Sequence, residues 1–110
     1  MGPMNSVGQY FETLPQRFRA EASKGVDAIF QWEITGEGGR EFHAVVKDGT
    51  LALASGKHEK PTVTLVVSAE HYLKIVNGEM NGVMAVMTRK MKVNGNVALA
   101  KKMQDIFPIK

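Results

Sequence analysis

The apolar residues near the start of the chain follow the period of a helix. Positions i, i+3, i+4 and i+7 are taken by Val7, Tyr10, Phe11 and Leu14. This spacing is typical of the buried stripe of an amphipathic helix, and Ser6 before it is a suitable N-cap. Because proline has no backbone N–H, we expect Pro15 to end this helix or to start a new turn. Phe18 and Ala22 then indicate a second helical piece.

From Asp27 onward apolar and polar residues alternate, which is the period of a strand with one buried face. Gly36–Gly39 and Asp48-Gly49 are hairpin turns between such segments, and a loop over 55–61 precedes the last of them. The predicted strands are Asp27–Thr35, Glu41–Lys47, Thr50–Ala54 and Thr62–Ser68. The two tight turns make the first three strands antiparallel neighbours.

The rest of the chain predicts helices around one more strand. Ser68 is a suitable N-cap and Asn77-Gly78 a suitable stop for a helix between them. The predicted elements are helices Ala69–Val76 and Glu79–Met87, strand Arg89–Val93 and helix Val97–Phe107, closed by Pro108. A twisted, mostly antiparallel sheet of five strands, covered on one face by helices, is an α+β fold. The helices are numerous enough to enclose a space as well as to fill it.

Methionine is concentrated in the second half of the chain. Of the seven methionines, four stand between residues 79 and 93, and a fifth stands twelve residues later: Met80, Met84, Met87, Met91 and Met103. Methionine is flexible and polarizable, so it fills gaps in ordinary cores and also lines surfaces that re-pack around varied apolar partners. The pattern alone leaves both interpretations open.

Length and composition indicate one globular domain over residues 1–110, of which 44% are hydrophobic and 23% charged. Residues 1–3 resemble a cloning remnant and carry no weight. The absence of cysteine excludes disulfides and thiolate metal sites. No apolar run approaches the roughly 20 residues of a membrane span, and neither a signal peptide nor a peroxisomal tail is visible. We therefore expect a cytoplasmic protein.

Charge is distributed unevenly along the chain. Residues 1–55 contain five Lys or Arg against seven Asp or Glu, whereas residues 56–110 contain nine against four. From Arg89 onward, six basic residues face Asp105 alone. This balance favours an anionic partner such as a phospholipid surface or a phosphate-bearing ligand, although a simple solvated face has the same appearance.

Residues that carry common enzyme chemistry form no recognisable site. The histidines at 43, 58 and 71 lack metal-binding spacing, and the Gly-x-Ser-x-Gly nucleophile elbow does not occur. Arg89–Lys102 contains no aromatic side chain on which a base would stack, which argues against nucleic acid as a partner. We predict no metal, no cofactor and no catalysis.

Several segments, in this order, resemble the sterol carrier protein-2 domain family. They are Phe30–Gly36, the Asp48-Gly49 turn, Thr62–Leu65 leading into Ser68-Ala69-Glu70, and the run from Asn77-Gly78 through Lys90–Asn96 to Phe107. The resemblance covers Val7–Phe107 and rests on the order of moderate features. Where the family usually places a glycine before Lys90, this chain has Arg89, which would narrow or charge the entrance of the ligand site.

The resemblance implies a hydrophobic tunnel between sheet and helices that holds a fatty acid, fatty acyl-CoA or sterol-like lipid non-covalently for transfer. On that basis the expected tunnel-lining residues are Trp32, Ile34, Met80, Met84, Met87, Met103, Gln104 and Phe107. Arg89, Lys101 and Lys102 are expected to hold an anionic head group or to touch an anionic membrane transiently. The alternative is an accessory domain that presents lipid to a partner enzyme, such as a lipid-metabolising one.

Overall fold

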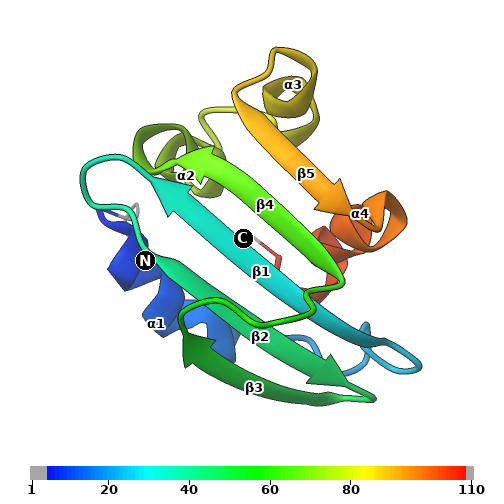
Figure 1. Ribbon diagram of the computed structural model, residues 1–110. Coiled ribbons are helices and arrows are strands. Elements are labelled where there is room, and N and C mark those ends of the chain that lie inside the picture. Colours follow the sequence, from blue (N-terminus) through cyan, green and yellow to red (C-terminus); the bar gives the residue numbers. More distant parts are fainter. Residues whose placement is uncertain (1–4, 109–110) are drawn as a thin grey trace.

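A computed structural model describes residues 5–108, so residues 1–4 and 109–110 lie outside the described range. Nine elements follow one another along the chain (Figure 1). They are α1 (Val7–Arg17), β1 (Asp27–Thr35), β2 (Glu41–Lys47), β3 (Thr50–Ser55), β4 (Val63–Ser68), α2 (Ala69–Val76), α3 (Gly82–Met87), β5 (Met91–Gly95) and α4 (Val97–Ile106). The predicted α+β class is confirmed, with an open sheet of five strands.

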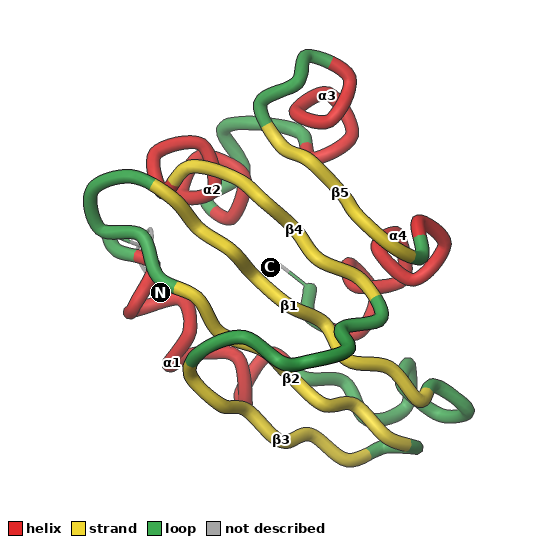
Figure 2. The backbone as a smooth tube through the Cα atoms, in the orientation of Figure 1, coloured by secondary structure: helices red, strands yellow, loops and turns green. Residues whose placement is uncertain are grey.

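The strands lie in the order β3-β2-β1-β4-β5. Every neighbouring pair is antiparallel except β1 and β4, which are parallel. The parallel pair requires the chain to return from β3 across the sheet, and Figure 1 shows this connection passing over the face that the helices leave open. The helices lie together on the opposite face (Figure 2).

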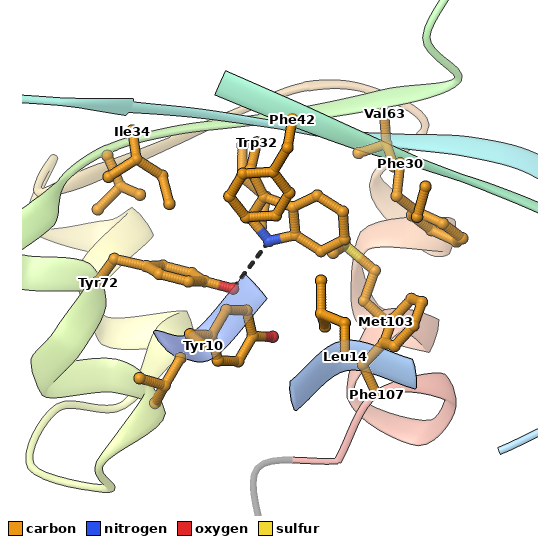
Figure 3. Packing of buried hydrophobic residues seen from close by; sticks show 14 of the residues in the cluster. Tyr10, Leu14, Phe30, Trp32, Ile34, Phe42, Val63, Tyr72, Met103 and Phe107 are labelled. Carbon is orange, nitrogen blue, oxygen red and sulfur yellow. Dashed lines mark hydrogen bonds between the residues drawn. The ribbon is translucent and has the colours of Figure 1, made fainter. Parts of the chain in front are cut away.

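The core fills the layer between sheet and helices. Alternate residues of β1 and β2 point into it, including Phe30, Trp32 and Phe42, all with 0% exposure. The rings of Trp32 and Phe42 are stacked with their centroids 4.8 Å apart (Figure 3). From the helical side Leu14 and Phe107 close the layer. Period-two alternation in the sequence therefore identified the buried face of β1 correctly.

The prediction for Pro15 was wrong, because α1 continues through it to Arg17. Near the end of a helix a proline removes only one hydrogen bond, and the burial of Val7, Tyr10 and Leu14 on the core offsets that loss. The N–H of Phe18 still bonds to the Leu14 carbonyl. Instead of a second helical piece, turns follow at residues 20–25.

The boundaries around the methionine segment also differ from the expected ones. α3 begins at Gly82 and not at Glu79, because the Asn81 side chain accepts from the N–H groups of Val83 and Met84 and so caps the helix there. β5 begins two residues later than expected, since Arg89 and Lys90 complete the end of α3.

Candidate functional site: an apolar pocket between three helices and the sheet

A cavity of about 300 Å³ lies beyond the aromatic core, at the β4–β5 side of the sheet. Its wall is almost entirely apolar and comes from α2, α3, α4, the inner face of β4 and β5, and Tyr10 of α1. The wall residues are Tyr10, Leu65, Tyr72, Ile75, Val76, Gly82, Val83, Val86, Met87, Met91, Val93, Val97, Ala100, Lys101, Met103, Gln104 and Phe107. This volume is at the lower end of the ~300–1,000 Å³ typical of small-molecule pockets.

The cavity exists because helices cover this side of the sheet incompletely. Met91 and Val93 of β5 stand opposite Val67 and Leu65 of β4 and point to the helical face, yet both remain half-buried. α3 has only six residues and lies at one end of β5, while α4 lies near the other end (Figure 2). The space between these two helices is the pocket.

Five of the sequence-predicted residues lie in the pocket wall. Met87 comes from α3, Lys101, Met103 and Gln104 come from α4, and Phe107 follows α4. Met103 and Phe107 are also part of the buried core, so they form the inner end of the wall. Met87 is 71% exposed and Lys101 and Gln104 are exposed too, which places them at the opening.

The other predicted residues lie outside the wall. Trp32 and Ile34 were expected to line the tunnel, but both are buried in the core, because the wide covering of α1 and α2 leaves no free space at β1. Met80 precedes α3 and packs against the core. Met84 is 53% exposed and is absent from the wall. Arg89 and Lys102 are exposed and are likewise absent from it, and their expected contact with an anionic head group or membrane stays a prediction.

Sequence reasoning missed the contribution of α2 to the wall. Tyr72, Ile75 and Val76 stand at i, i+3 and i+4, the spacing of an apolar stripe, and this signal was available. Tyr10 was identified as part of the α1 stripe, but its place next to a cavity depends on the position of α2. Its ring stands edge-on to that of Tyr72, with centroids 5.3 Å apart (Figure 3).

The inner wall stays uncharged at neutral pH. Burial raises the pKa of Tyr72 well above its ordinary value, and the nearby Tyr10 adds to this effect. Burial also raises the pKa of Tyr10. The Tyr72 hydroxyl accepts a hydrogen bond from Trp32 Nε1 at 2.8 Å, which ties the pocket wall to the core. Within the described residues, Lys101 is the single charged group of the wall.

The profile of the SCP-2 sterol transfer family matches residues 10–108. The chain belongs to this family. The match spans both the strands that form the core and the helices that form the pocket.

Two relatives contain a segment similar to this SCP-2 domain, one in a chain of similar length and one in a much longer chain. The oleate-induced peroxisomal protein POX18 of Candida maltosa is 32% identical over 100 residues, which cover 87% of this chain and 79% of that protein. The hydroxysteroid dehydrogenase-like protein 2 of Rattus norvegicus is 26% identical over 103 residues, covering 93% of this chain but only 20% of the rat protein. The chain thus spans about a fifth of that larger relative.

A solved structure confirms the fold. Sterol carrier protein-2 from Aedes aegypti, in complex with the C16 fatty acid palmitate, superposes with a TM-score of 0.60 at 17% identity, covering 90% of this chain and 94% of that one. Among the helices of residues 5–108, none has the length and apolar character needed to cross a membrane.

Proposed function

We propose that this SCP-2 domain binds a lipid with a long hydrocarbon chain non-covalently in the pocket between α2, α3 and α4, as a carrier that releases it again. The apolar wall of this pocket is the observation that carries the proposal. The palmitate complex of the Aedes aegypti protein and the oleate-induced relative from Candida maltosa support it. The first name gives a fatty acid as ligand, and the second says that a fatty acid induces the protein.

The two polar side chains of α4 favour a ligand with an anionic head group. Lys101 and Gln104 stand three positions apart, so they are neighbours on one face of the helix at the opening of the pocket. A carboxylate placed there meets one cation and one amide donor, while its chain lies against Met87, Met103 and Phe107. In a fatty acyl-CoA the phosphates would occupy the same place.

The expected affinity suits a carrier. Burial of hydrocarbon contributes about 0.8 kcal/mol per methylene, or roughly 10–12 kcal/mol for about 14 methylenes. Association costs at least about 4 kcal/mol, and ordering of the short helix α3 reduces the total further. Micromolar to submicromolar binding is the result, which permits release on a useful time scale.

A second role has its own support. The relatives named hydroxysteroid dehydrogenase-like protein 2 carry the matching segment within much longer chains, of which this chain covers between 20% and 25%. The same pocket in this protein would then present lipid to an enzyme that modifies it. In either role the domain binds and contributes no chemistry. The cytoplasmic location stays a prediction, and a named peroxisomal relative is a reason to test it.

Native mass spectrometry of the freshly purified protein, followed by organic extraction and lipid identification, tests the proposal. Adducts of fatty-acid or acyl-CoA mass that disappear on extraction would support it and identify the cargo. An apo mass would be followed by titration with a fluorescent fatty acid. The absence of saturable binding in that titration would overturn the proposal.

A further inference from the structure

The large apolar side chains that the structure exposes are gathered at the pocket opening. They are Val83, Met84, Val86 and Met87 of α3 and Val97 at the start of α4, with exposed fractions between 39% and 71%. We call the four residues of α3 the α3 tip, whereas Val97 belongs to the α4 side of the pocket wall. The α3 sequence, Gly-Val-Met-Ala-Val-Met, contains no polar side chain at all. An apolar group of this kind, exposed around a pocket entrance, marks a site of contact with something apolar.

Basic residues are concentrated in the segments that follow the α3 tip along the chain. Arg89 and Lys90 follow α3, Lys92 is on the outer face of β5, and Lys101 and Lys102 are on α4; all five are exposed. Between residues 77 and 108 the acidic residues are Glu79 and Asp105, against these five basic ones. The combination of an apolar centre with a positive rim is complementary to a bilayer with anionic head groups, where each Lys or Arg near the surface adds to the attraction.

Backbone polar groups at both ends of α3 are hydrogen-bonded. At its start, Asn81 Oδ1 accepts from the N–H groups of Val83 and Met84. At its end, the carbonyls of Ala85 and Val86 accept from the N–H groups of Lys90 and Arg89. The Thr88 hydroxyl donates to the Met84 carbonyl at 2.7 Å. Polar groups paired in this way do not require water, which is the condition for entry into lipid.

Arg89 stands where a helix end ordinarily has glycine. Its φ is 62°, in the left-handed region, and its N–H and that of Lys90 form the two bonds of a Schellman motif. An arginine is strained there and a glycine is not. Backbone strain of this kind is found mainly at functional positions. At residue 89 the strained residue places a positively charged guanidinium next to the α3 tip.

We propose that the α3 tip inserts into the head-group region of an anionic bilayer, with the basic rim on the lipid phosphates, so that lipid passes between membrane and pocket without crossing water. The passage of lipid rests on the proposed function, whereas the docking does not. A protein partner fits less well, because the α3 tip has neither the aromatic anchors nor the polar groups that such interfaces use.

Co-sedimentation with vesicles tests the docking. One set contains equal parts of phosphatidylglycerol and phosphatidylcholine, and the other contains phosphatidylcholine alone. We expect binding to the anionic set only, weakened at high salt. Met84→Glu should weaken it at least tenfold, because Met84 is exposed and outside the pocket wall. Ala54→Glu adds the same charge on β3, at the far edge of the sheet, and should leave the binding nearly unchanged.

Arg89→Gly distinguishes an effect on vesicle binding from an effect on the stability of the fold. It should weaken binding to anionic vesicles about fivefold, as expected for one basic residue, while the unfolding temperature stays the same or rises. No binding to anionic vesicles, or equal losses in Met84→Glu and Ala54→Glu, would overturn the docking. Fatty-acid titration without vesicles measures binding to the pocket separately. Vesicle binding without fatty-acid binding would overturn the proposed function and leave the docking supported.

Discussion

Trp32 Nε1 donates a hydrogen bond of 2.8 Å to the hydroxyl of Tyr72, joining the central strand β1 to helix α2 beneath it. Trp32 is completely buried and Tyr72 is 5% exposed, so water does not compete for this bond. On one side the pair contacts the aromatic core and on the other it contacts the pocket. The position of α2, and with it one wall of the pocket, depends on this contact.

Tyr72→Phe should therefore lower the free energy of unfolding by about 1–3 kcal/mol, because it leaves the indole N–H buried without an acceptor. Urea denaturation followed by tryptophan fluorescence measures the change, since the chain has one tryptophan. Leu73→Ala, on the same helix but half-buried, is the control for general loss of packing on α2. A loss for Tyr72→Phe below about 0.5 kcal/mol would contradict the importance of the bond.

Gln31 fixes the crossover connection to the open face of the sheet. It is 3% exposed, and its Oε1 accepts from the His58 N–H while its Nε2 donates to Glu33, both at 2.8 Å. We expect Gln31→Leu to destabilise the fold by about 1–3 kcal/mol and to make the connection more accessible to protease. Thermal melts and limited proteolysis check both effects. Lys57→Ala, which removes ion pairs of the exposed Lys57 with the half-buried Glu33 and the exposed Glu41, should change little.

Met87 and Met84 are one turn apart on α3 but differ in their relation to the pocket. Met87 is in the wall and Met84 is not. Met87→Glu should weaken fatty-acid binding in solution about tenfold or more, since it places a charge beside the hydrocarbon chain and repels the carboxylate. Met84→Glu should have little effect in the same titration. Equal losses would show that the ligand lies elsewhere on α3.

Arg89→Gly should stabilise the fold by about 1 kcal/mol, because glycine adopts the left-handed conformation without steric cost. Arg89→Ala removes the same charge but keeps the strained φ, so it should not gain stability. Denaturant unfolding of both variants distinguishes relief of strain from loss of charge. A stabilisation shared by both would assign the effect to charge instead.

Alkaline pH should unfold the protein through its tyrosines. Burial raises the pKa of both Tyr10 and Tyr72, so above about pH 10 the unfolded chain releases protons that the folded chain retains. Stability is therefore unaffected by these groups below that pH and decreases above it. The chain contains only these two tyrosines, so tyrosinate absorbance and loss of helical circular dichroism should appear together. Tyrosinate forming in a still-folded protein would contradict this coupling.

Periodicity in the sequence was sufficient for most of the fold. The bounds of β1, β2 and α2 were predicted as the structure has them, because alternation and caps are local signals. The course of α1 through Pro15 was missed, since burial on the core outweighs one lost bond. No local sequence signal predicts the parallel pairing of β1 and β4, because it depends on where the long connection after β3 places β4 in the sheet.

The candidate site was less predictable for a related reason. Apolar spacing shows which residues face inward but does not distinguish a filled interior from a hollow one. Trp32 and Ile34 face inward below a helix that covers them, whereas Met91 and Val93 face inward where none does. The difference is set by helix length and position, and α3 is short because of Asn81, whose capping role depends on geometry.

The opening of the pocket is separate from the stacked aromatic side chains Trp32 and Phe42 in the core. It is formed by side chains that are largely exposed, such as Val83 and Met87, and that contribute little to the stability of the fold. Mutations at these positions are therefore tolerated by selection for folding, and they alter the shape of the entrance directly. A lineage that begins from such a chain can diversify its cargo through a few residues of α3 while the scaffold is inherited intact.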